Sequence, residues 1–391
     1  MPRRCPTCEH VDDGEPFCER DGALLHQIDE DGARADARIG TELGDYHLVS
    51  IVEDGSMGRV YEAWHIERRE RVAIKLLHPH LVDDPIARAR FRREHEVGSQ
   101  LHHPHIVNVL GYLEAEDGAP AIVMEYLDGL PLSDLFERES VLSVGATLRL
   151  GAQLALALEY AHEALIVHRD LKPENLFILR DDKGQLHLKL LDFGAVKLAL
   201  DLGPKLTAVG TTIGSPEYMS PEQARGDEDL DEGTDVFAMA VILYEALAGA
   251  TPFEAPDAAR VLFRLIHEPA DPLSWHRKGV SAAVDALFAR ALSSDRSVRP
   301  SSPQSLLSEL AELVGINDTV ESIATRHADE LDALIRARAP REKAKVIDKT
   351  PLPQPSDELA LGGGPSPLLI IGLGLGGLIA AVAAVFYFMT Q

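Results

Sequence analysis

The segment HRDLKPEN, residues 168–175, combines side chains whose types and spacing could perform chemistry. Asp170 could accept a proton from a substrate hydroxyl, and Lys172 could neutralise negative charge that develops beside it. Asn175 offers an amide oxygen of the kind that Mg²⁺ prefers, and Asp192 in the later run DFG would add a carboxylate. A base, a cation and metal ligands are the groups that transfer of a phosphoryl group to a hydroxyl requires.

Two earlier segments could hold the phosphates of a nucleotide. Gly55 and Gly58 lie in the run EDGSMGRV, where a missing Cβ lets the backbone approach a phosphate. Lys75 ends the run VAIK in an apolar strand, where an unpaired ammonium is costly. We therefore expect Glu94, on a helix predicted from about residue 85 to 101, to pair with Lys75 and to orient it toward the phosphates.

The hydrophobic pattern predicts the elements that must position these residues. From Tyr46 to about Tyr126, short β-branched runs separated by turn signals indicate strands. Residues 144–164 and 235–248 instead carry apolar side chains at helical spacing. The sequence predicts a small β-rich lobe, then a larger helical lobe, with the chemistry between them.

The stretch from Tyr46 to about Val314 resembles the eukaryotic-like Ser/Thr protein kinases of bacteria. The motifs VAIK, HRDLKPEN, DFG and SPE appear in the order of that family. The resemblance implies an α+β, bilobal protein-kinase fold over residues 44–315. It also implies Mg-ATP as the phosphoryl donor, with Mn²⁺ as an alternative metal, and protein hydroxyls as acceptors. Lys172, two residues after Asp170, is what Ser/Thr kinases carry.

The same resemblance implies roles for further residues. Met124 takes the gatekeeper position, and Glu125 to Leu127 form the hinge whose backbone binds adenine. Asp235 would brace the catalytic loop, and Glu222 would pair with Arg299. The remaining expected nucleotide contacts are Val52, Gly55, Ser56, Gly58, Val60, Ala73, Lys75 and Asn175.

One departure from the family pattern leaves an alternative function open. Glu53 replaces the first glycine of the phosphate loop, and its carboxylate could repel the nucleotide. A pseudokinase scaffold is therefore the alternative to an active enzyme. A small-molecule kinase is disfavoured because the peptide-binding stretch from Gly214 to Glu222 is intact.

The activation segment expected between Asp192 and Glu222 contains several hydroxyls. Thr207, Thr211 and Thr212 are its candidate autophosphorylation sites. Arg169 could bind a phosphothreonine there and so order the segment.

All three cysteines lie in residues 1–22, which resemble a zinc-ribbon-like knuckle. Cys5 and Cys8 form a C-x-x-C pair, and Cys18 follows ten residues later. Tetrahedral zinc takes four ligands, and the spacing predicts Asp21 as the fourth, with His10 as the alternative. Thiols without a metal are the competing interpretation. Residues 23–43 are polar and acidic, as is typical of a linker.

The C-terminal part predicts a membrane anchor. Residues 316–338 indicate a helical extension, and the Pro- and Gly-rich residues 339–366 a tether. Residues 367–389 are apolar on every face and long enough to span about 30 Å of hydrocarbon. Lysines in the tether favour a single-pass anchor in the cytoplasmic membrane with the kinase domain in the cytoplasm.

The net charge and two glycines in the apolar C-terminal run indicate which partners to expect. A formal net charge of −25 argues against nucleic-acid binding, which requires a basic surface. Gly372 and Gly376 have the small-xxx-small spacing of paired membrane helices, which makes a homodimer one interpretation and simple flexibility another.

Overall fold

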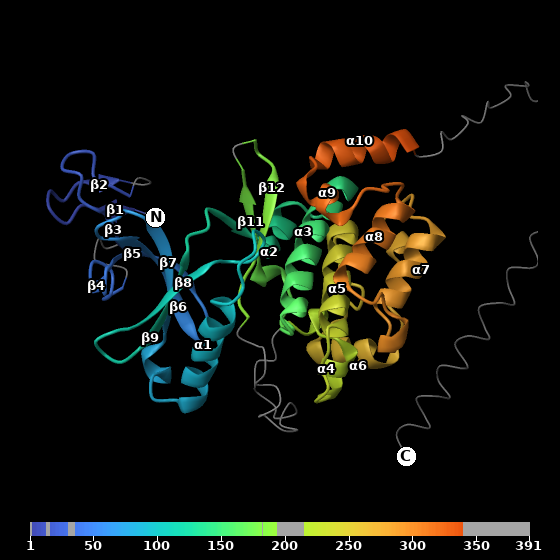
Figure 1. Cartoon of the computed structure of the whole chain (residues 1–391), viewed down its shortest axis with the longest axis horizontal. Coiled ribbons are helices and arrows are strands. Elements are labelled where there is room, and N and C mark those ends of the chain that lie inside the picture. Colours follow the sequence, from blue (N-terminus) through green and yellow to red (C-terminus); the bar gives the residue numbers. More distant parts are fainter. Residues whose placement is uncertain (1, 13–15, 30–35, 182, 194–214, 339–391) are drawn as a thin grey trace, which may run out of the picture. The chain divides into compact units, whose positions relative to one another are not determined.

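The computed structural model describes residues 2–12, 16–29, 36–181, 183–193 and 215–338 (Figure 1). The strands are β1 (Arg3–Arg4), β2 (Val11–Asp12), β3 (His26–Gln27), β4 (Glu42–Leu43), β5 (Tyr46–Asp54), β6 (Gly58–His65), β7 (Arg71–Leu77), β8 (Val109–Glu114), β9 (Pro120–Glu125), β10 (Gly129–Pro131), β11 (Leu176–Arg180) and β12 (Leu186–Leu190). The α-helices are α1 (Pro85–Gly98), α2 (Leu132–Arg138), α3 (Val144–Glu163), α4 (Pro221–Arg225), α5 (Gly233–Ala248), α6 (Ala258–His267), α7 (Ala282–Ala291), α8 (Pro303–Leu313), α9 (Val320–Thr325) and α10 (Ala328–Arg338).

The N-terminal knuckle is a three-stranded sheet in the order β2-β1-β3. Cys5, Cys18 and Leu25 are buried together at its centre. β3 pairs with β1 and therefore belongs to the knuckle, although it lies in the segment expected to be a linker. The knuckle thus extends past residue 22, because Leu25 completes its small core.

The N-terminal lobe is built on a six-stranded antiparallel sheet in the order β4-β5-β6-β7-β9-β8. The strands expected between residues 46 and 126 are all present in it. β4 adds a strand that the sequence did not indicate, and its Leu43 is buried against the sheet.

Helix α1 packs on this sheet through apolar side chains that share one face of the helix. Asp84 caps its first turn by accepting a hydrogen bond from the Ile86 amide at 2.9 Å. Ala87 and Phe91 are buried against Leu77 of β7. Glu94 follows Phe91 by three residues and so lies on the same helix face. This packing brings Glu94 to the strand that carries Lys75.

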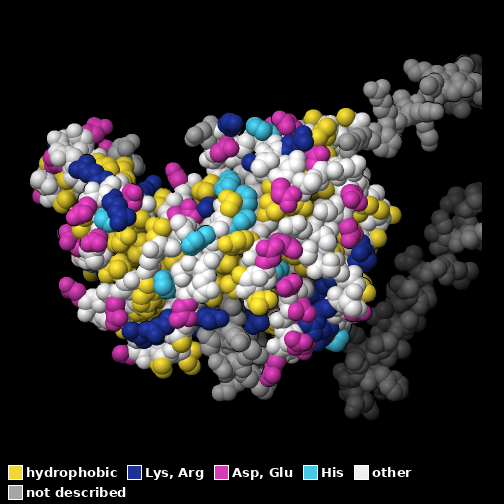
Figure 2. Space-filling view, viewed as in Figure 1, with side chains coloured by type: hydrophobic (Ala, Val, Ile, Leu, Met, Phe, Trp, Pro, Cys, Tyr) yellow, Lys and Arg dark blue, Asp and Glu magenta, His cyan; other side chains and the backbone are white. Residues whose placement is uncertain are grey.

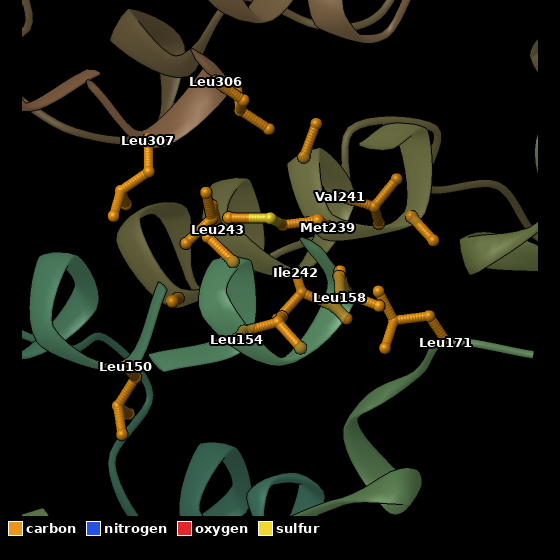
Figure 3. Packing of buried hydrophobic residues seen from close by; sticks show 14 of the residues in the cluster. Leu150, Leu154, Leu158, Leu171, Met239, Val241, Ile242, Leu243, Leu306 and Leu307 are labelled. Carbon is orange, nitrogen blue, oxygen red and sulfur yellow. The ribbon is translucent and has the colours of Figure 1, made fainter. Parts of the chain in front are cut away.

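The helical lobe is organised around α3 and α5, whose apolar side chains interdigitate with those of α8 (Figure 3). α5 buries thirteen of its sixteen residues, as expected for a helix at the centre of a domain. Leu171, between Asp170 and Lys172, is 2% exposed and packs into this cluster (Figure 3). The core thereby anchors the loop that carries the expected catalytic base.

The predicted extension at residues 316–338 forms two helices, α9 and α10, that pack on α3. The Arg149 guanidinium donates to the Arg326 carbonyl, and the Gln153 amide donates to the Ala324 carbonyl. Asp332 accepts a hydrogen bond from the Gly145 amide at 2.7 Å. The extension is therefore an integral layer of the helical lobe.

Within the described residues up to 338, no helix is both long and apolar enough to cross a membrane. The tether expected at 339–366 and the membrane helix expected at 367–389 lie outside the described residues. The same holds for Thr207, Thr211 and Thr212.

Candidate active site

Two carboxyl groups from distant parts of the chain contact the ammonium of Lys75. Its ammonium lies 2.6 Å from Oε1 of Glu94 on α1 and 2.9 Å from Oδ2 of Asp192, which follows β12. The exposed fractions of the Lys75, Glu94 and Asp192 side chains are 15%, 12% and 38%. The pairing of Lys75 with Glu94 expected from the sequence is confirmed, and Asp192 joins the same cluster.

Burial and mutual charge set the ionisation of this cluster. Burial opposes the charge of Lys75, but the carboxylates of Asp192 and Glu94 outweigh it and raise the pKa of the ammonium. Burial also opposes ionisation of Asp192, yet Lys75 lowers the pKa of this carboxyl to about 2. Burial and the neighbouring charge of Asp192 raise the pKa of Glu94. Asp192 is thus the carboxylate held ionised at neutral pH.

The catalytic loop places Lys172 and Asn175 around Asp170. The Lys172 ammonium lies 3.3 Å from Oδ2 of Asp170. Nδ2 of Asn175 donates to the Asp170 carbonyl at 2.7 Å and to its Oδ2 at 3.1 Å. The Asp170 side chain remains 48% exposed, so a substrate hydroxyl can reach it. The three residues predicted from one short motif therefore form one group.

A buried aspartate holds the backbone of this loop. The two carboxylate oxygens of Asp235, at the start of α5, accept hydrogen bonds from the amides of His168 and Arg169 at 2.8 and 2.9 Å. His162 lies 2.8 Å from the same carboxylate. Burial would raise the pKa of Asp235, but the bond from His162 and the neighbouring donors lower it. The expected brace is present, with His162 as an additional partner.

Strained backbone occurs at both ends of the site. Arg169 and Asp192 have φ angles of 66° and 55°, which side chains other than glycine rarely adopt. His168 connects the two residues, because its Nε2 donates to the Leu191 carbonyl at 2.9 Å and its ring packs on Phe193. The loop and the segment around Asp192 are thus in contact through His168.

The glycine loop connects β5 to β6 and is fastened to β7. A Cβ on Gly58 would lie 2.5 Å from the Leu76 carbonyl, so only glycine fits at this position. Glycine is therefore required at position 58 because β7 lies so close, in addition to the expected approach of the loop backbone to a phosphate. Glu53 is exposed on β5, and Ser56 is exposed in the loop.

The other expected nucleotide contacts come from adjacent strands and the hinge. β6 pairs Val60 with Lys75, and β9 pairs Met124 with Ala73. Directly paired and alternate residues share a face of an antiparallel sheet, so these four residues lie on one face. Leu127 follows in the hinge, and Val52 lies near the end of β5 with 48% of its surface exposed.

Two residues that were not expected to contribute to this site, His78 and Lys189, support it. His78 holds the glycine loop twice: its amide donates to the Met57 carbonyl at 3.1 Å, and its Nε2 donates to the Gly55 carbonyl at 2.7 Å. Lys189 of β12 contacts Oε1 of the hinge residue Glu125 at 2.6 Å. A lysine in an apolar strand was a signal for Lys189, as it was for Lys75. No sequence pattern pointed from His78 to a loop twenty-three residues earlier.

The segment after the activation segment is tied to the helical lobe. Arg299 forms a bidentate pair with Glu222, with both nitrogen–oxygen distances at 2.8 Å and both side chains 1% exposed. This pairing confirms the one expected from the sequence. Gln223 donates to the Arg169 carbonyl at 2.6 Å, and Ser215 donates to Glu174 at 3.4 Å. Residues 215–223 thus contact the catalytic loop directly.

The knuckle brings four potential metal ligands together. The sulfurs of Cys5, Cys8 and Cys18 and a carboxylate oxygen of Asp21 all lie within 4.8 Å of one another. His10, the alternative fourth ligand, is not part of this group.

Several histidines gather in the middle of the face drawn in Figure 2. Among the histidines of the chain, His105 has ring contacts with His103 and His187. His103 stacks on Tyr160, and His105 lies 3.1 Å from the Leu188 carbonyl. These histidines therefore pack within the fold.

Comparison with known proteins gives consistent results. The protein kinase domain family matches residues 46–310. The serine/threonine-protein kinase pkn3 of Myxococcus xanthus is 37% identical over 303 residues, which cover 76% of this chain and 55% of that protein. The serine/threonine-protein kinase PknB of Mycobacterium tuberculosis is 36% identical over 250 residues, covering 63% of this chain and 39% of that protein. The chain therefore spans about half, or less, of the length of these relatives.

The fold comparison agrees with the sequence comparison. The crystal structure of the Mycobacterium tuberculosis PknI kinase domain superposes with a TM-score of 0.54 and 29% identity. The match covers 70% of this chain and 98% of that domain.

We predict that His78→Ala weakens binding of Mg-ATP by about 2- to 10-fold, the value of one hydrogen bond, because the Gly55 carbonyl loses its donor. The control is His80→Ala, since His80 is exposed and stacks on His78 without bonding the loop. The measurement is the Kd for a non-hydrolysable ATP analogue with Mg²⁺. Equal affinities in the wild type and His78→Ala would contradict a role for His78 in holding the loop.

Proposed function

Because the chain belongs to the protein kinase family, we propose that it transfers the γ-phosphoryl group of Mg-ATP to Ser or Thr hydroxyls of proteins. One observation carries this proposal. Lys172 and Asn175 both contact the Asp170 carboxylate. Asp192, which follows β12, is paired with Lys75. These are the groups that phosphoryl transfer needs, and each is present with a partner that orients it.

In the proposed reaction, Asp170 accepts the proton of the substrate hydroxyl as that oxygen attacks the γ-phosphorus, and the bond from the γ-phosphorus to the bridging oxygen breaks so that ADP leaves. Its carboxylate is exposed and is held from one side by the Asn175 amide nitrogen, so the acceptor oxygen can approach from the other. Lys172 neutralises the charge of the transferred group from a position beside the base. Lys75, kept protonated by its two carboxylates, holds the α- and β-phosphates.

The residues present fit a magnesium ion. Nδ2 of Asn175 is engaged by Asp170, which directs its amide oxygen away from that residue. The Asp192 carboxylate is partly exposed and has a pKa of about 2, so it is ionised at neutral pH. Asn175 and Asp192 would hold Mg²⁺, or Mn²⁺ in its place, and the ion supplies neutralisation of the phosphate charge.

We propose autophosphorylation of Thr207, Thr211 or Thr212 as the activating step. The support is Arg169, whose Nε and Nη1 are buried and have no hydrogen-bond partner among the described residues. A phosphothreonine would supply acceptor oxygens for these two nitrogens, while Nη2 donates to the Leu230 carbonyl at 3.2 Å. Phosphopeptide mapping of active enzyme that finds none of the three threonines modified would refute this step.

We also propose that Cys5, Cys8, Cys18 and Asp21 bind one structural Zn²⁺. The support is the convergence of three sulfurs and a carboxylate, with the spacing Cys-x-x-Cys and Cys-x-x-Asp. Backbone amides of Thr7 and Cys8 point at the Cys5 sulfur, and that of Arg20 points at the Cys18 sulfur, each at 3.4 Å. Such donors stabilise thiolates, which are the form that binds the metal.

We propose, finally, that residues 367–389 anchor the chain in the cytoplasmic membrane, with the kinase domain in the cytoplasm. The support is the uncharged run of twenty-two residues from Leu368 to Met389 and the lysines that precede it. Its small-xxx-small spacing also supports pairing of two copies in the membrane. Equal membrane association of the full chain and a variant lacking residues 367–391 would exclude this anchor.

We predict that the full-length protein incorporates γ-labelled phosphate into itself and into a generic protein substrate, and that Asp170→Ala abolishes both. A loss of about 10³-fold or more is expected because proton acceptance and orientation of the hydroxyl disappear together. Binding of an ATP analogue serves as the control, because it reports whether the variant is folded. Label in the wild type no higher than in Asp170→Ala would favour the pseudokinase scaffold, and label on small molecules alone would favour a small-molecule kinase.

We predict about one zinc ion per purified chain, as measured by elemental analysis, since the four ligands make one tetrahedral set. Cys18→Ser is expected to lower the zinc content. Asp21→Cys is expected to retain it and to slow its removal by a chelator, because a fourth thiolate replaces a carboxylate. A metal-free wild type with three freely titratable thiols would contradict the zinc site.

A further inference from the structure

The nucleotide-facing side of the N-terminal sheet continues beyond the expected ATP contacts to a buried glutamate. Glu62 of β6 pairs with Ala73 of β7 and therefore lies on the same face as Val60, Lys75 and Met124. Its side chain is 1% exposed. A buried carboxylate is costly unless charged donors surround it, so its partners define what this position does.

The partners of Glu62 come from two directions. Oε2 accepts a hydrogen bond from the Arg3 guanidinium of the knuckle at 2.7 Å and one from the Ser50 hydroxyl at 2.6 Å. Oε1 accepts a hydrogen bond from Nε of Arg71 at 2.8 Å. Burial opposes ionisation of Glu62, but Ser50, Arg3 and Arg71 together lower its pKa. The carboxylate is thus a charged junction between the knuckle and the kinase sheet.

Arg71 connects Glu62 to the hinge, because it contacts both Glu62 and Tyr126. Its guanidinium carbon lies 3.6 Å from the centre of the Tyr126 ring, a close cation–π contact. Tyr126 stands between Glu125 and Leu127 in the segment expected to bind adenine. The chain of contacts from Arg3 through Glu62 and Arg71 to Tyr126 is continuous.

A second contact of the knuckle reaches β5 immediately before the glycine loop. The pairing of β5 with β6 is irregular around Ile51, and the Ile51 amide donates instead to Oε1 of Gln27 in β3 at 2.7 Å. Val52, an expected nucleotide contact, is the next residue. Phe17 of the knuckle also packs edge-on against Trp64, with ring centroids 4.9 Å apart.

We propose that the knuckle is part of the ATP site and that Arg3 is a positioning residue, which fixes the hinge through Glu62 and Arg71. Among the described residues, the Arg3 side chain forms its hydrogen bonds and ion pair with Glu62, so it acts on the hinge through Glu62. The knuckle holds the hinge on one side of the nucleotide through Arg3, and β5 on the other through Gln27. The inference rests on the proposed function for its nucleotide, and it does not require the knuckle to contain zinc.

The test compares full-length Arg3→Ala, Arg3→Lys and Arg4→Ala with the wild type. Arg4 is the matched control because it is the next residue of β1, and its side chain has no ion pair in the described part of the chain. The Kd for a Mg²⁺-loaded, non-hydrolysable ATP analogue, the KM for ATP, kcat, the unfolding midpoint and the zinc content are measured for each.

Arg3→Ala is expected to raise the Kd and the KM for ATP by about tenfold, as for loss of one hydrogen bond to a buried charge, while kcat at saturating ATP stays within about twofold. Arg3→Lys is expected to fall between Arg3→Ala and the wild type, since it keeps the charge with fewer donors. Arg4→Ala is expected to match the wild type.

Two results would overturn the inference. One is a wild-type Kd in Arg3→Ala, and the other is a loss of kcat in parallel with a lower unfolding midpoint, which would indicate a structural role alone. Because the analogue Kd requires no phosphoryl transfer, it tests the inference even if the wild type proves catalytically inactive. A wild type without transfer would count against the proposed function, whatever the Kd of Arg3→Ala.

Discussion

The ion cluster of Lys75, Glu94 and Asp192 is the constraint on which the rest of the site depends. It forms only if β7 is in register, if α1 packs with Glu94 toward the sheet, and if the segment after β12 adopts the positive φ of Asp192. The charge of Asp192 raises the pKa of Glu94, and a metal ion on Asp192 would relieve this repulsion. The same cluster therefore joins the two lobes and prepares a cation site.

The catalytic loop is held by a different physical means. Asp170, the proposed base, has a side chain that is 48% exposed, and neighbouring residues supply the rigidity of the loop. Leu171 packs into the apolar core, and buried Asp235 satisfies two loop amides that would otherwise lack partners. The glycine loop is similarly held from outside, by His78. In both loops, neighbouring residues that are buried or hydrogen-bonded hold the backbone in place, and the loops themselves keep exposed residues.

Periodicity and motifs in the sequence predicted the two lobes, the main helices and the pairing of Lys75 with Glu94. The pairing of Glu222 with Arg299 was predicted from the resemblance to the kinase family. The sequence did not predict the contacts of His78 or the network from Arg3 to Tyr126. Those contacts join residues tens of positions apart that occur in no local pattern, and only the packed fold brings them together. The extent of the knuckle was underestimated for a related reason: β3 is only two residues long, so its pairing with β1 is not visible as alternation.

The most direct test of this account is a double-mutant cycle between Lys75 and Glu94, measured as the single-turnover rate of phosphoryl transfer at saturating ATP. If Glu94 acts by orienting Lys75, each of Lys75→Met and Glu94→Gln lowers the rate by about 10²-fold, and the double variant is no slower than Lys75→Met alone. Multiplying effects in the double variant, or a wild-type rate in Glu94→Gln, would contradict the claim that this ion cluster organises the site.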